Sequence, residues 1–91
     1  MGVDLREQAV EMLARRAADM TVCWWSTAGN GRAWEASRSE WRDRFARLLA
    51  SWSPGELCSL IWWIRAGSAR TRELMDEALA LDRQANRRRG T

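Results

Sequence analysis

The chain has 91 residues, of which 46% are apolar and one is Pro, so it is long enough for a single domain with its own core and is neither disordered nor fibrous in composition. The formal net charge is +3, and all fifteen basic residues are Arg because the sequence contains no Lys. A GC-rich genome produces this bias. Arg also suits the binding of carboxylates and phosphates, to which its guanidinium group donates paired hydrogen bonds.

Residues 3–25 are predicted to form the first helix. Apolar residues recur there at steps of three and four, the period of one helix face, and these are Val10, Leu13, Ala17, Met20 and Trp24. Residues 21–25 are of types that favour strands, and the Asn30-Gly31 pair that follows is a strong hairpin signal. A short β-hairpin over residues 20–36 is therefore the alternative to a helix followed by a glycine loop.

The second helix is predicted over residues 33–52. Large apolar side chains fall on one narrow stripe of this helix, and they are Trp34, Trp41, Phe45, Leu48 and Trp52. A stripe with three indoles and a phenyl ring must be covered by other elements to leave water. We therefore expect this helix to lie at the centre of the fold.

Two further helices complete the predicted fold. Ser53-Pro54-Gly55-Glu56 is a capping box with Pro in the first turn, which starts a third helix over residues 54–66. A fourth helix over residues 69–86 has an apolar face that we expect to point inward, formed by Leu74, Ala78, Leu81 and Ala85. Short loops favour antiparallel neighbours, so the fold class is all-α, a compact antiparallel four-helix bundle of residues 1–86 with a disordered Arg-rich tail at 87–91.

The residue types exclude most catalytic and metal chemistry. Cys23 and Cys58 are the only thiols and there is no His, so an ordinary structural zinc site or a Cys nucleophile with its usual base is not expected. Glu73, Asp76 and Glu77 lie near the start of a helix, where the helix dipole explains acids better than a bound cation does. We expect no enzyme activity, no cofactor and no metal.

The sequence shows neither a signal-peptide pattern nor an apolar run long enough for a membrane span, so we expect a cytoplasmic protein with free thiols. Attachment to a membrane surface is disfavoured because anionic lipid would repel the twelve acids. A DNA-binding helix-turn-helix centred on Gly67 fails, since Trp63 and Glu73 stand where small and apolar residues are needed.

The candidate binding residues are indoles and guanidinium groups outside the predicted core. Trp62 points away from the apolar face of the third helix and Trp63 lies on its flank, while Trp25 lies on the flank of the first helix. Arg38 lies on the second-helix stripe and Arg42 at its edge, where each either stacks on indole or lays its stem along apolar surface with a solvated head. We expect Trp62, Trp63, Trp25, Arg32, Arg38 and Arg42 to contact a partner.

The predicted function is therefore that of a small non-enzymatic protein-binding module. It would capture a host or regulatory protein or associate with a second copy of itself as a dimer. In size, lack of motifs and lack of Lys, it is similar to the accessory and inhibitor proteins that phages and mobile elements carry in GC-rich bacteria. Binding of nucleic acid through Arg and exposed Trp is the alternative.

Overall fold

The computed structural model describes residues 4–21, 30–67 and 69–90, which form helices with no β-strand among them. The elements are α1 (Leu5–Thr21), α2 (Asn30–Leu48), the 3-10 turn η1 (Leu49–Ser51), α3 (Pro54–Ala66) and α4 (Ala69–Gly90). The predicted all-α, compact four-helix fold is confirmed.

The helix boundaries decide between the two predictions for residues 20–36. Because α2 already begins at Asn30, residues 30–36 are helical and the β-hairpin alternative is wrong. The predicted end of the first helix at Trp25, together with Cys23 and Trp24, lies outside the described residues. The last turn of the predicted second helix tightens into η1. At the other end of the chain, α4 continues to Gly90, beyond the predicted end at Asn86.

The capping box at the start of α3 is confirmed. The Ser53 hydroxyl accepts a hydrogen bond from the Glu56 backbone N–H at 3.3 Å, and the Glu56 carboxylate accepts one from the Ser53 backbone N–H at 3.0 Å. Pro54 occupies the first turn, where its missing N–H costs nothing. This local sequence fixes where α3 begins, and so fixes which of its residues face the core.

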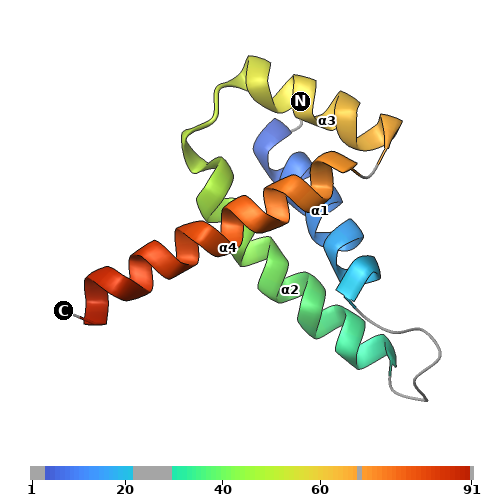
Figure 1. The fold of residues 1–91 in the computed structure, drawn as a ribbon. Coiled ribbons are helices and arrows are strands. Elements are labelled where there is room, and N and C mark those ends of the chain that lie inside the picture. The colour runs from blue at the N-terminus through green and yellow to red at the C-terminus, as the bar shows by residue number, and fades with distance from the viewer. Residues whose placement is uncertain (1–3, 22–29, 68, 91) are drawn as a thin grey trace.

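The four helices pack in a crossed arrangement (Figure 1). α1 and α2 run side by side in opposite directions, α3 lies on the far side of α1 from α2, and α4 crosses α1 and α2. The contact between α1 and α2 is the most extensive in the molecule.

The central helix is α1, so the expectation that the second helix lies at the centre is wrong. α1 contacts α2, α3 and α4, whereas α2 packs mainly on α1 and α4. The physical reason is side-chain size, since four of the six buried residues of α1 are Ala and permit close approach from several sides. These four are Ala9, Ala14, Ala17 and Ala18.

Most of the predicted α2 stripe reaches the core. Trp41 and Phe45 are buried with their rings stacked at a centroid separation of 5.5 Å, and Leu49 is fully buried one turn further on. Leu48 and Trp52 pack against this core while partly buried. Trp34 is half-buried and lies outside the core, with its indole N–H donating to Asp19 at 2.8 Å.

The second half of α4 departs from its predicted orientation. Leu74 and Ala78 are buried as expected, but Leu81 and Ala85 are exposed, so their predicted inward placement is wrong. Figure 1 shows that the C-terminal turns of α4 extend past the other described helices, so this part of α4 has fewer helices beside it than the first half has.

We expect Trp41→Ala to lower the free energy of unfolding by about 3–5 kcal/mol, because removing a buried indole leaves a cavity in the core. Trp62→Ala is the matched control: it makes the same chemical change at a side chain that is 64% exposed, and we expect it to cost no more than about 0.5 kcal/mol. Denaturant unfolding followed by circular dichroism measures both. Equal losses in the two variants would contradict this assignment of the core.

Candidate functional site

The outward face of α3 carries two exposed indoles. Leu57, Leu60, Ile61 and Ile64 are buried on the inward face of this helix. Successive helical residues are rotated by about 100°, so Trp62 must point away from that face and Trp63 to its side. The two side chains are 64% and 57% exposed, and their rings meet edge to face with centroids 5.1 Å apart. The sequence-based prediction that Trp62 points outward agrees with this placement.

A groove runs along the flank of α3 beside Trp63. Its volume is about 440 Å³, and its lining residues are Trp52, Gly55, Glu56, Ser59, Leu60, Trp63 and Arg70. A Cβ atom added at Gly55 would meet only the Ser53 hydroxyl, at 4.0 Å, so the groove has free space above this residue. The groove and the exposed indoles form one continuous surface, which we call the α3 surface. The α3 surface consists of the groove residues and of four further residues that are exposed, Cys58, Trp62, Arg65 and Ala66.

The walls of the groove are held by contacts from other elements. Arg6 of α1 donates to the backbone carbonyls of Leu49 at 3.0 Å and Trp52 at 2.9 Å, which fixes the connection that leads into α3. The Glu56 carboxylate is held by the capping box, and these hydrogen bonds from Ser53 keep its pKa below the ordinary value. The groove therefore has a fixed acidic group, Glu56, at the start of α3, and a basic group, Arg70, beyond its end.

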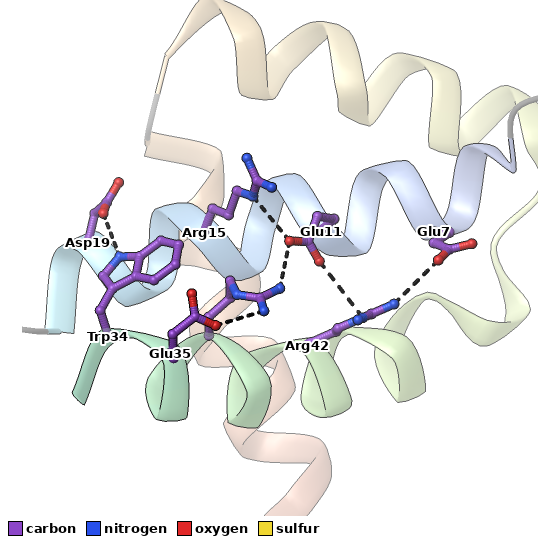
Figure 2. A network of polar contacts seen from close by, with 8 residues as sticks. Glu7, Glu11, Arg15, Asp19, Trp34, Glu35 and Arg42 are labelled. Atoms are coloured by element: carbon purple, nitrogen blue, oxygen red, sulfur yellow. Dashed lines mark hydrogen bonds and ion pairs between the residues drawn. The ribbon is translucent and has the colours of Figure 1, made fainter. Parts of the chain in front are cut away.

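Arg38 and Arg42 lie on a different part of the molecule, a polar seam between α1 and α2. Figure 2 shows the Arg42 guanidinium group reaching from α2 to Glu7 and Glu11 of α1. Arg38 contacts Glu11 at 2.7 Å and Glu35 at 2.9 Å, while Arg42 contacts Glu7 at 3.3 Å and Glu11 at 3.8 Å. These charges are neutralised within the chain, on the side of α1 opposite α3.

Arg32 also lies apart from Trp62 and Trp63. Arg32 is exposed in the first turns of α2, which begin at the end of the molecule away from α3 (Figure 1). Trp25 lies outside the described residues. Of the five predicted residues that the structure describes, Trp62 and Trp63 share the outer side of α3, whereas Arg38 and Arg42 share the polar seam. Sequence reasoning missed the groove beside Trp63. The local signals for this groove in the sequence are Trp52, directly before the capping box, and Gly55, within it.

Arg38 meets the prediction that it stacks on indole, but not the prediction of a solvated head, because its guanidinium group pairs with Glu11 and Glu35. Its guanidinium carbon lies 5.9 Å from the centroid of the Trp34 ring, while its charge is held by acids rather than solvated alone. A closer cation-π contact joins Arg44 to the buried Trp41 ring at 4.8 Å. Arg44 also pairs with Asp82 of α4 at 3.1 Å, so it links the core indole to a third helix.

Glu11 is the hub of the polar seam. Burial alone would raise the pKa of its carboxyl, but hydrogen bonds from Arg15 and Arg38 and the positive charge of Arg38 together hold the pKa below its ordinary value of 4.5. The folded chain therefore stabilises the ionised Glu11 carboxylate relative to the unfolded chain. Glu11 therefore acts as a structural anion that joins α1 to α2.

The described residues contain no group of three or more His, Cys, Asp or Glu side chains that could hold a metal ion. Among those same residues, no helix has both the length and the apolar character needed to cross a bilayer. No protein-family model matches this chain, no curated protein matches its sequence, and no solved structure matches its fold. The function must therefore be inferred from the surfaces themselves.

We expect Glu11→Gln to lower the free energy of unfolding by about 1–2 kcal/mol at neutral pH, because it removes charge-assisted hydrogen bonds from a partly buried site. The lowered pKa means that the ionised Glu11 stabilises the fold above pH 4.5 and that this stabilisation is lost as the pH falls through the folded-state pKa. The variant should therefore lose less stability on acidification than the wild type.

The matched control is Glu35→Gln, which removes a 60% exposed carboxylate that pairs with Arg38. We expect this exposed pair to contribute about 0.5 kcal/mol or less. Denaturant unfolding of the three proteins at several pH values between neutral and acid is the measurement. Parallel pH profiles for wild type and Glu11→Gln would show that Glu11 is not the responsible carboxyl.

Proposed function

We propose that this chain is a protein-binding module that docks a partner on the α3 surface. The observation that carries the proposal is the pair of adjacent, exposed indoles, Trp62 and Trp63, on a helix whose opposite face is buried. Trp is the residue type most enriched among the side chains that dominate binding energy at protein interfaces. Two such rings in contact form an exposed apolar patch of the kind that a partner covers.

The surroundings of the two indoles support docking of a protein. The groove beside Trp63 is open and apolar along Trp52 and Leu60, with charged groups only at its ends. Its start is held by the capping box of α3, so the surface is largely formed before a partner arrives and little conformational entropy is lost on binding. The small residues Cys58 and Ser59 leave space for inserted side chains.

The partner class is a host or regulatory protein, or a second copy of the chain. The composition of the sequence favours an accessory or inhibitor role of the kind found in phages and mobile elements, acting without catalysis. The polar seam contributes no free charge to this surface, since Arg38 and Arg42 are paired with acids of their own chain. Docking would therefore depend on the indoles and the groove.

The test is photo-crosslinking in cells of the source organism or its host, with a diazirine amino acid placed at Cys58 on the outer face of α3. We expect a specific adduct that disappears when Trp62 and Trp63 are both replaced by Ala, with the melting temperature nearly unchanged. The control places the same amino acid at Ser39, exposed on α2. An adduct that persists without the two indoles, or that forms equally from position 39, would sink the proposal.

Nucleic-acid binding is the second candidate, favoured by the charge at the end of α4. No acid follows Asp82, and four Arg lie between residues 83 and 89. Arg83, Arg87 and Arg88 are exposed on the turns that extend away from the core (Figure 1). A projecting basic helix suits contacts to phosphates.

If this second function holds, the chain retards labelled single-stranded DNA or RNA in a gel at low salt, and affinity falls steeply as salt is added. Arg87→Ala with Arg88→Ala should reduce the slope of log affinity against log salt by about 1–2. Arg32→Ala with Arg72→Ala removes the same charge elsewhere and should leave the slope unchanged. Absence of any retardation at low salt would rule this function out.

A further inference from the structure

The outer face of α3 carries mostly small side chains in its first turns and two indoles in its last turns, where Arg65 and Ala66 are also exposed. Gly55, Cys58 and Ser59 occupy the first turns, and Trp62 and Trp63 occupy the last turns. All five are exposed, and the groove runs beside the first turns. A helix face of this kind has protrusions at one end and space at the other, which is the condition for fitting a copy of itself turned end to end.

We propose that the occupant of the α3 surface is a second copy of this chain, with the two α3 helices packed antiparallel about a twofold axis between Ser59 and Trp62. This inference rests on the proposed docking function and names its partner. In this register Trp62 of each copy lies over Ser59 of the other, and Ala66 lies over Gly55. Each copy therefore supplies both the protruding rings and the space that receives them, as a closed twofold interface requires.

In this dimer the grooves of the two copies lie on the same side of the helix pair. The twofold axis lies in the interface and runs across both helices, so the groove flank of one α3 lies next to the groove flank of the other. Trp63 of one copy then reaches the groove of the other near Gly55, Glu56 and Ser59, all of which line it. Gly55 leaves the space for this ring, since nothing but the Ser53 hydroxyl lies within 4.0 Å of a Cβ at that position.

The charges at the ends of the groove match the same arrangement. Glu56 lies at the start of α3, and Arg70 lies just after its end, at the start of α4. Arg70 also pairs with Glu73 at 2.8 Å, and its guanidinium group has further N–H donors for a second carboxylate. Turning the second copy end to end brings Glu56 of each copy to the end of the groove where Arg70 of the other lies. The antiparallel orientation also places the positive end of each helix dipole beside the negative end of the other. Parallel packing would instead bring like charges together.

The first experiment measures the mass of the purified full chain by sedimentation equilibrium over a wide concentration range. We expect twice the monomer mass of 10.5 kDa at high concentration, with reversible dissociation on dilution. Gly55→Leu fills the groove and should raise the dissociation constant at least tenfold, as should Trp62→Ala. The matched control is Gly31→Leu on α2, where an added Cβ meets nothing within 4 Å, and it should leave the dissociation constant unchanged.

The second experiment tests the register by exchanging charges. Arg70→Glu leaves two acids at the groove ends and Glu56→Arg leaves two bases, so each variant alone should dimerise at least tenfold more weakly than wild type. Mixing the two variants restores both opposite-charge pairs and should give a heterodimer. Circular dichroism of each variant checks that α3 remains folded, since Glu56 also belongs to the capping box.

The outcomes separate this inference from the proposed function. A wild-type chain that stays monomeric at every concentration overturns the inference, as does a dimer that Gly55→Leu and Trp62→Ala leave unchanged. If the chain is monomeric but Cys58 crosslinks in cells to a different protein through Trp62 and Trp63, the docking function stands and the second copy is excluded. A dimer lost in both α3 variants and re-formed by the charge-exchanged pair supports the inference.

Discussion

The fold depends on the packing of the aromatic stripe of α2 against the alanine-rich face of α1. Trp41 and Phe45 are the aromatic residues of the buried core, and the buried Ala residues of α1 belong to the same cluster and allow neighbouring helices to approach closely. Because small Ala residues lie on more than one side of α1, α3 and α4 can also pack against this helix. Larger side chains at these Ala positions would hold the neighbouring helices further from α1 and would expose the buried rings to water.

This arrangement divides the charged residues between structural and surface roles. Carboxylates of α1 and α4 neutralise most of the Arg of α2, with Glu11 joining α1 to α2 and Asp82 joining α4 to α2. Ion pairs this close to the surface stabilise the fold only modestly, but several of them around one carboxylate fix the relative positions of the helices. Their positive charge is therefore not offered to a partner, which leaves the indoles of α3 as the most prominent unused binding groups.

The position of α3 explains why its indoles remain uncovered. It packs mainly on α1, with a smaller contact to α4, and none of the other helices that the structure describes passes over its outer side (Figure 1). In a bundle of long parallel helices a second face would meet a neighbour. Here the helices cross, and the outer side of α3 keeps both of its indoles exposed.

The sequence by itself determined the elements that local physics controls. The capping box fixed the start of α3, and the three- and four-residue spacing identified the helices, the burial of Trp41 and Phe45, and the outward direction of Trp62. Only the tertiary structure decided that α1 is central and that Leu81 lies beyond the core. It also decided that Arg38 and Arg42 form ion pairs with acids of α1, and that Trp52 and Gly55 line a groove with Trp63. Helical periodicity specifies which residues share a face, but the residues that cover that face come from distant parts of the chain, and crossing angles set by side-chain size decide where they lie.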